Sequence, residues 1–165
     1  HFTFMRLDRL GADEIGEATK MMLEALKENY ITDVEIEMNI ALDTNNVSDA
    51  AGSIIEQQLR DLIADRNAAV FAARMDGTLV GYAIVVIEGD VADFWDLVVK
   101  KEYRRMGIGS SLIAEVENFA KGRGCRAIKL DVNIKNEAAV ELYEHLGYRK
   151  VSIIMMKGDR INGIP

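Results

Sequence analysis

The sequence predicts a mixed α/β (α+β) domain in which helices cover both faces of one central sheet. Apolar residues dominate three short runs between residues 68 and 99, and tight-turn signals separate these runs. After Gly107 the apolar period changes from two to 3.6, and helix and strand patterns then alternate. The 165 residues contain no repeat and no Pro-rich linker, so we expect a single domain over residues 1–165.

The first part of the chain predicts one strand and two helices. Residues 2–7 alternate weakly and favour a strand, and residues 13–29 carry apolar side chains on one helical stripe. Residues 30–47 are acidic and irregular, which is typical of a loop with a short helix. Asp49, or the serine before it, can cap a second helix that runs to about Asp65.

The middle of the chain predicts three antiparallel strands at residues 68–74, 79–88 and 91–99. An Asp-Gly turn joins the first two strands and a Gly-Asp turn joins the next two, so consecutive strands must be neighbours in the sheet.

The last part predicts two further helix and strand pairs. A helix begins at residue 108 and ends near Gly122 or Gly124, and a strand follows at residues 126–132. Residues 136–146 predict another helix, and residues 151–157 predict the final strand.

Composition excludes several classes of protein. The formal net charge of −7 argues against general nucleic-acid binding, and no apolar run approaches the ~20 residues that span a bilayer. Cys125 is the single cysteine, so neither an internal disulfide nor a cysteine-based zinc site can form, and we expect no metal site. The low cysteine content indicates reducing surroundings, and we expect a cytoplasmic protein.

A cationic, glycine-containing loop precedes the helix at residue 108. Unpaired backbone N–H groups at a helix N-terminus point outward and attract anions, and glycines let an anion approach closely. The segment is therefore a candidate phosphate site, although strand-turn-helix connections of this kind also occur for packing reasons alone. It is neither a dinucleotide fingerprint nor a P-loop. Its cations are Lys100, Lys101, Arg104 and Arg105.

A second informative segment begins at Asn136, which is a good N-cap for the following helix. Asn136, Val140 and Tyr143 share one face of that helix. Taken alone, Tyr143 is more compatible with core packing than with chemistry.

Together these segments resemble the GNAT N-acetyltransferase superfamily. The pyrophosphate loop of that family reads Gln/Arg-x-x-Gly-x-Gly/Ala, which Arg104 to Gly109 match in full. Its late motif reads Asn-x-x-Ala-x-x-Leu-Tyr-x-x-x-Gly-Phe, and here Tyr148 replaces the final Phe. The late motif is similar to that of the ribosomal-protein N-terminal acetyltransferases. The resemblance covers roughly residues 78–157, and Arg105 is a departure because the family often has Gly there.

The resemblance implies the GNAT fold, with a mixed sheet of six to seven strands, and acetyl-CoA as the acetyl donor. It places the pyrophosphate on backbone amides of the loop, the pantetheine arm against the strand before it, and an asparagine beside that arm. The residues it assigns to the cofactor are Leu97, Val98, Val99, Arg104, Arg105, Met106, Gly107, Ile108, Gly109, Ser110 and Asn136.

The resemblance also implies catalytic roles. Tyr143 is expected to be the general acid that protonates the departing thiolate. Asp131 occupies the place of a catalytic Glu in the ribosomal-protein enzymes, within the similar sequence Leu-acid-Val, and is a candidate general base. Asp93, Asp96 and Glu88 are rivals, and a water chain without any protein base is a further alternative.

The acceptor is expected to be an amine. Residues 28–59 contain seven acids and no Lys or Arg, which favours a cationic small molecule such as a polyamine, or a peptide amine, unless these acids form only a solvated surface. Protein N-terminal acetylation and small-amine acetylation both remain open. A non-catalytic acyl-CoA-binding module is the alternative of a different class. We expect no nucleic acid or membrane partner, while the family resemblance makes a homodimer possible.

Overall fold

A single mixed sheet forms the centre of the computed structural model, which describes residues 4–28, 31–43 and 46–157. The strands follow one another across the sheet in chain order. The first four are antiparallel neighbours, and the last two are parallel. The strands are β1 (Met5–Arg9), β2 (Ala68–Met75), β3 (Thr78–Glu88), β4 (Val91–Val99) and β5 (Ala127–Leu130).

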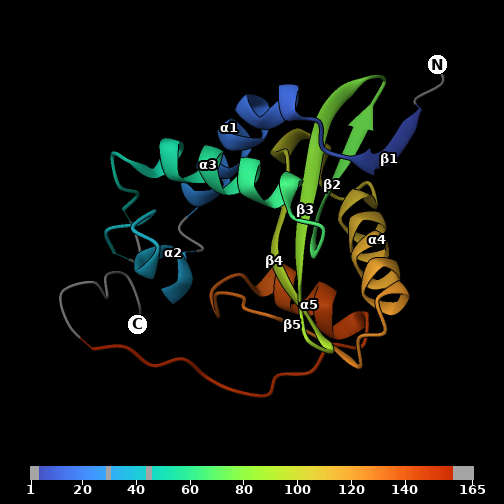
Figure 1. Ribbon diagram of the computed structural model, residues 1–165. Helices are drawn as coiled ribbons and strands as arrows, with labels where there is room; N and C mark the ends of the chain where they lie inside the picture. The colour runs from blue at the N-terminus through green and yellow to red at the C-terminus, as the bar shows by residue number, and fades with distance from the viewer. Residues whose placement is uncertain (1–3, 29–30, 44–45, 158–165) are drawn as a thin grey trace.

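Helices cover both faces of this sheet (Figure 1). Two short 3-10 helices, η1 (Ala12–Glu14) and η2 (Lys101–Tyr103), precede α1 and α4. The α-helices are α1 (Ile15–Leu26), α2 (Asp33–Glu37), α3 (Ala51–Ala64), α4 (Ile108–Gly122) and α5 (Glu137–His145).

Each face has its own apolar core because side chains alternate across a strand. On one face, Leu59 of α3 and Tyr82 of β3 are fully buried together with residues of α1. On the other face, Leu112 and Val116 of α4 are fully buried against the sheet, together with Phe94 of β4. The predicted fold class and the helices on both faces are confirmed.

The final strand was predicted wrongly. Residues 151–157 belong to no strand, and the sheet that the described residues form has five strands rather than six to seven. The segment has strand-like composition, but it runs away from the sheet and contacts no sheet edge, so no ladder can form (Figure 1).

Several boundaries also differ from prediction. The first strand begins at Met5, residue 4 lies outside it, and the predicted residues 2 and 3 lie outside the described part of the chain. The strand predicted at residues 126–132 is β5 at Ala127–Leu130, so Asp131 follows the strand instead of lying on it. Helix α3 begins at Ala51, and no side chain caps it. The Ser48 hydroxyl instead donates to the Asn39 carbonyl oxygen at 2.6 Å. Among the described residues, no helix is long and apolar enough to cross a membrane.

Candidate functional site

A cleft opens where β4 and β5 separate. The two strands pair only from Val91 to Phe94 on β4, opposite Ala127 to Leu130 on β5. Beyond this point β4 continues to Val99 beside β3, while β5 has ended. The edge of β4 that follows Phe94 is therefore open toward the cleft.

A β-bulge at Trp95 determines which way the β4 side chains point. Ile84 of β3 faces Asp96, whereas the next residue of β3 faces Phe94, so Trp95 is the extra residue. Without the bulge, Phe94 and Val98 would share a face. Instead, Phe94 packs in the core under α4, and Val98 packs in the core under α1 and α3. The bulge therefore turns Asp96, two residues before Val98, to the side of α1 and α3.

The cleft has a volume of about 690 Å³ and collects most of the residues predicted for the site. Met106 is the exception, because it does not line the cleft and is 53% exposed. Predicted residues that line the cleft are Leu97, Val98, Val99, Arg104, Arg105, Gly107, Ile108, Gly109, Ser110, Asp131, Asn136 and Tyr143.

One end of the cleft is the N-terminus of α4. Gly107 occupies the N-cap position in a left-handed conformation, with φ of 82°. Arg105 is also left-handed, with φ of 61°, at the position where the resembled family often has Gly. These turns leave the first-turn amides of a 15-residue helix beside the cleft, and such amides are a suitable anion site.

Arg104 connects this loop to the acidic segment. Its Nη1 and Nη2 atoms donate to the two carboxylate oxygens of Glu28 at 2.9 and 2.5 Å. Its Nε atom donates to the carbonyl oxygen of Val99 at 3.1 Å. The Arg104 guanidinium lowers the pKa of Glu28, so that this carboxylate stays ionised. The sequence did not predict this pair, because 76 positions separate its members.

Helix α5 supplies the predicted tyrosine. Asn136 caps the helix as predicted, because its Oδ1 atom accepts a hydrogen bond from the Ala139 amide at 3.2 Å. Tyr143 packs edge-on against Phe94 and Tyr148, with ring centroids 6.1 and 5.6 Å apart. Burial raises the pKa of the Tyr143 hydroxyl, and the nearby Tyr148 and Asp96 add to the rise, so Tyr143 holds its proton at neutral pH.

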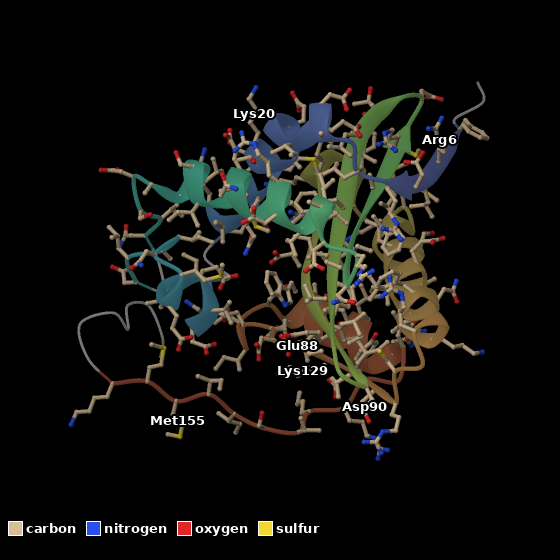
Figure 2. All side chains as sticks on the ribbon, viewed as in Figure 1. Arg6, Lys20, Glu88, Asp90, Lys129 and Met155 are labelled. Atoms are coloured by element: carbon tan, nitrogen blue, oxygen red, sulfur yellow. The ribbon has the colours of Figure 1, made fainter. Side chains whose placement is uncertain are left out.

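The four candidate carboxylates lie in different surroundings. Asp96 is partly buried in the cleft, and burial raises its pKa to about 7, with a further contribution from the charge of Glu35. Asp93 also lines the cleft, and burial raises its pKa. Asp131 lines the cleft but is exposed. Glu88 is exposed at the foot of the sheet, does not line the cleft, and is labelled in Figure 2.

Asp96 and Tyr143 approach the cleft from opposite faces of the sheet. Asp96 lies on the face of α1 and α3, where its charge also contributes to a raised pKa of the buried Tyr82 hydroxyl. Tyr143 packs with the core of the α4 face. A carboxylate that titrates near neutral pH and a protonated hydroxyl on two sides of one cleft can accept and donate a proton, respectively.

The acidic segment contributes two carboxylates to the described lining of the cleft, Glu28 and Glu35. Glu28 is paired with Arg104, and Glu35 accepts hydrogen bonds from the amide and hydroxyl of Thr32. Both line the cleft together with Asp93 and Asp96 of β4 and with Asp131, which follows β5. Within the described part of the chain, no group of three or more His, Cys, Asp or Glu side chains is placed to hold a metal ion.

Comparison with known proteins connects this geometry to a family. The model of the family described as "Acetyltransferase (GNAT) family" matches residues 21–148. The ribosomal protein bS18-alanine N-acetyltransferase of Escherichia coli (strain K12) is 30% identical over 83 residues, which are 50% of this chain and 56% of that protein. An N-alpha-acetyltransferase of Sulfurisphaera tokodaii is 30% identical over 105 residues, which are 56% of this chain and 63% of that protein. The chain spans about half the length of the curated relatives it matches.

Solved structures share the fold. An aminoglycoside N-acetyltransferase, AAC(6')-Iy in complex with CoA, superposes with a TM-score of 0.71 at 15% identity, over 97% of each chain. The PaiA N-acetyltransferase from Thermoplasma acidophilum, in complex with coenzyme A, gives a TM-score of 0.68 at 19% identity, over 88% of this chain and 90% of that one. At these identities the likeness shows the fold alone.

Proposed function

The chain belongs to the GNAT acetyltransferase family, and on this premise we propose that it transfers an acetyl group from acetyl-CoA to a primary amine in the cleft between β4 and β5. The observation that carries the proposal is the arrangement around this cleft. A helix N-terminus lies at one end, an open strand edge forms one wall, and Asp96 and Tyr143 reach in from opposite sides.

The residues present are suitable for holding coenzyme A. The amides from Arg105 to Ser110 would bind the pyrophosphate, because left-handed turns and the start of α4 direct unpaired N–H groups toward the cleft. The open edge of β4 at Leu97–Val99 would pair with the peptide-like pantetheine arm. Asn136, also in the cleft, would contact the same arm. When bound, acetyl-CoA supplies an acetyl group activated as a thioester.

We assign the general base to Asp96 in preference to the sequence candidate Asp131. An amine with a pKa of about 10 must lose a proton before it can attack the thioester. Asp96 has a pKa of about 7 and lies on the side of the acidic segment, where the acceptor would enter. Asp96 would take the ammonium proton before attack, directly or through water, and release it to solvent. As the new C–N bond forms and the C–S bond breaks, the nitrogen loses a second proton, which balances the proton that the departing thiolate gains. Asp131 is exposed, and its role stays a prediction.

Tyr143 would act at the sulfur. Its hydroxyl stays protonated at neutral pH and packs beside Phe94, next to the point where β4 and β5 separate. A thiol has an ordinary pKa of about 8.5, so a hydrogen bond from Tyr143 would stabilise the thiolate as it leaves, and a proton would finally be delivered to it.

The acceptor that this cleft favours is a cationic amine. Five carboxylates line it, against two arginines, one of which is paired with Glu28. The two relatives described above are named a ribosomal protein bS18-alanine N-acetyltransferase and an N-alpha-acetyltransferase, which supports a peptide amine as the acceptor. The carboxylates equally suit a small polyamine.

The test is release of free CoA from acetyl-CoA by the purified chain. The acceptor panel contains spermidine, lysine, an aminoglycoside, and peptides with free or blocked N-termini. Release with one acceptor class would support the proposal and identify the acceptor. If acetyl-CoA raises the melting temperature but no acceptor releases thiol, the result favours a non-catalytic acyl-CoA-binding module over an enzyme. If acetyl-CoA has no effect on melting, the assignment of the cleft to coenzyme A fails.

A further inference from the structure

A second cavity opens beside the cleft, along helix α3, which lies across one face of the sheet (Figure 1). Its volume is about 600 Å³. Met38, Gln58 and Trp95 line both cavities, so the second cavity begins where the cleft ends. The Gln58 side-chain amide donates to the sulfur of Met38 at 3.7 Å, which joins α3 to the end of α2 at this border. An acceptor longer than the cleft would therefore continue into the second cavity.

Trp95 presents an exposed aromatic ring at the border between the two cavities. As the extra residue of the β4 bulge it belongs to neither core, and it is 37% exposed although it lies in the middle of a strand. The face of an indole ring packs against methylene chains and attracts cations. Trp95 also directly precedes Asp96, to which we assign the general base. A ligand that reaches Asp96 therefore has an apolar, cation-attracting surface beside it.

One flank of α3 forms a wall of the second cavity and carries two carboxylates. Ile54, Gln58, Asp61 and Asp65 are spaced at i, i+4, i+7 and i+11, which places them on one side of the helix. With a rise of about 1.5 Å per residue, Asp61 and Asp65 lie roughly 4.5 and 10.5 Å beyond Gln58 along the helix axis. Both carboxylates therefore lie away from the border with the cleft. The other lining residues are Ser53, Gln57 and Leu62.

No base of the described chain neutralises these two carboxylates. Asp61 and Asp65 each accept a hydrogen bond from a neutral group, at 2.9 and 2.8 Å, and neither forms an ion pair with another described residue. Arg60 is the only base of α3 and contacts Glu56 instead, at 3.5 Å. The described lining of the second cavity contains no Lys or Arg. The cavity therefore favours a ligand that joins a cation to an apolar chain.

We propose that the second cavity binds the distal ammonium group of an α,ω-diamine or polyamine acceptor. This rests on the proposed acetyl transfer in the cleft and names the class of amine. The reacting amine would lie at Asp96, the methylene chain would pass along Trp95, and the second ammonium group would lie between Asp61 and Asp65. A peptide suits the cavity less, because the backbone groups of α3 are paired within the helix and offer its amides no partners. A methylene chain needs no such partners.

Acceptor preference tests the subsite when each diamine is compared with a monoamine of equal length. The KM of diaminooctane should be about 10-fold below that of octylamine, which is what two exposed ion pairs contribute together. Asp61→Asn combined with Asp65→Asn should abolish this advantage, raising the KM of diaminooctane about 10-fold with kcat unchanged and leaving the KM of octylamine as it was. Diaminopropane is too short to engage both places, so it should gain nothing over propylamine.

Glu17→Gln combined with Asp49→Asn is the matched control. It removes the same charge from two exposed carboxylates that line neither cavity, so it should change no KM. Asn keeps the side-chain oxygen that accepts each hydrogen bond, so the double variant of α3 should keep the wild-type circular dichroism.

Isothermal titration of diaminooctane into the chain saturated with CoA gives a readout that does not require acetyl transfer. The double variant of α3 should raise the Kd about 10-fold. If it changes neither Kd nor KM, or weakens octylamine and diaminooctane equally, the subsite is refuted while acetyl transfer stands. Acetylation of peptides without any preference for the long diamine would refute it too. Diamine binding that the variant weakens, without release of CoA by any acceptor, would support the subsite and overturn the proposed function.

Discussion

Replacing Asp96 by Asn removes a carboxylate that the fold holds partly out of water. Burial, with Glu35 nearby, raises the pKa of Asp96 from 3.8 to about 7. In the unfolded chain the ordinary value returns, so the folded chain binds this proton more tightly. The free energy of unfolding is therefore highest below about pH 4, where Asp96 is protonated in both the folded and the unfolded chain. It falls as the pH rises toward 7, and the loss is complete above that pH.

The magnitude follows from the two pKa values. The difference between about 7 in the folded chain and 3.8 in the unfolded chain corresponds to a cost of about 4 kcal/mol once Asp96 is ionised. At pH 5 the unfolded chain has already ionised Asp96, so some of this cost is already present. A comparison of pH 5 with pH 8 therefore measures only the share of the cost that develops above pH 5. Over that interval the wild-type chain should lose about 3 kcal/mol of unfolding free energy relative to Asp96→Asn, which cannot ionise.

Urea unfolding at pH 5 and pH 8, followed by circular dichroism, measures this difference. Asp131→Asn is the matched control, because Asp131 lines the same cleft but is exposed, and it should follow the wild-type chain. If wild type and Asp96→Asn change in parallel between the two pH values, Asp96 does not have a raised pKa. The choice of Asp96 as general base would then lose its physical support.

Three further predictions concern the loop and α5. Tyr143→Phe should lower kcat by about 100-fold or more, while isothermal titration gives an unchanged Kd for acetyl-CoA; a kcat near wild type would contradict its role as acid. Gly107→Ala should lower the unfolding free energy by about 1 kcal/mol because of the positive φ of Gly107. Gly122→Ala, at the end of α4, should raise it by about 0.5 kcal/mol. Equal effects of the two variants would contradict the left-handed conformation of Gly107. Glu28→Gln should cost under about 1 kcal/mol at pH 7, and the difference should vanish at acid pH, where Glu28 loses its charge.

Local signals predicted the elements around the cleft. The change of period at Gly107 gave the start of α4, and Asn136 was correctly predicted to cap α5. Both features depend on residues within one turn of each other, so the sequence contains the whole signal. The cationic loop was predicted to lie at the helix N-terminus, and the structure has it there beside the cleft.

Features that depend on distant residues were not predictable in this way. The raised pKa of Asp96 follows from a bulge at Trp95 and from Glu35, which is 61 positions earlier in the chain. Nothing in the local pattern of β4 distinguishes Asp96 from Asp93. The strand expected at residues 151–157 was wrong for a related reason, because strand propensity describes the segment and not the edge with which it must pair.

Acetyl transfer to an amine nitrogen in the cleft between β4 and β5 is tested by mass spectrometry of acceptors incubated with carbon-13-labelled acetyl-CoA and the purified chain. We predict one labelled acetyl group on an amine nitrogen of at least one acceptor, none on the blocked peptide, and transfer about 100-fold slower or more with Asp96→Asn and with Tyr143→Phe. Undiminished transfer by both variants, or stabilisation by acetyl-CoA without any labelled acceptor, would contradict this account.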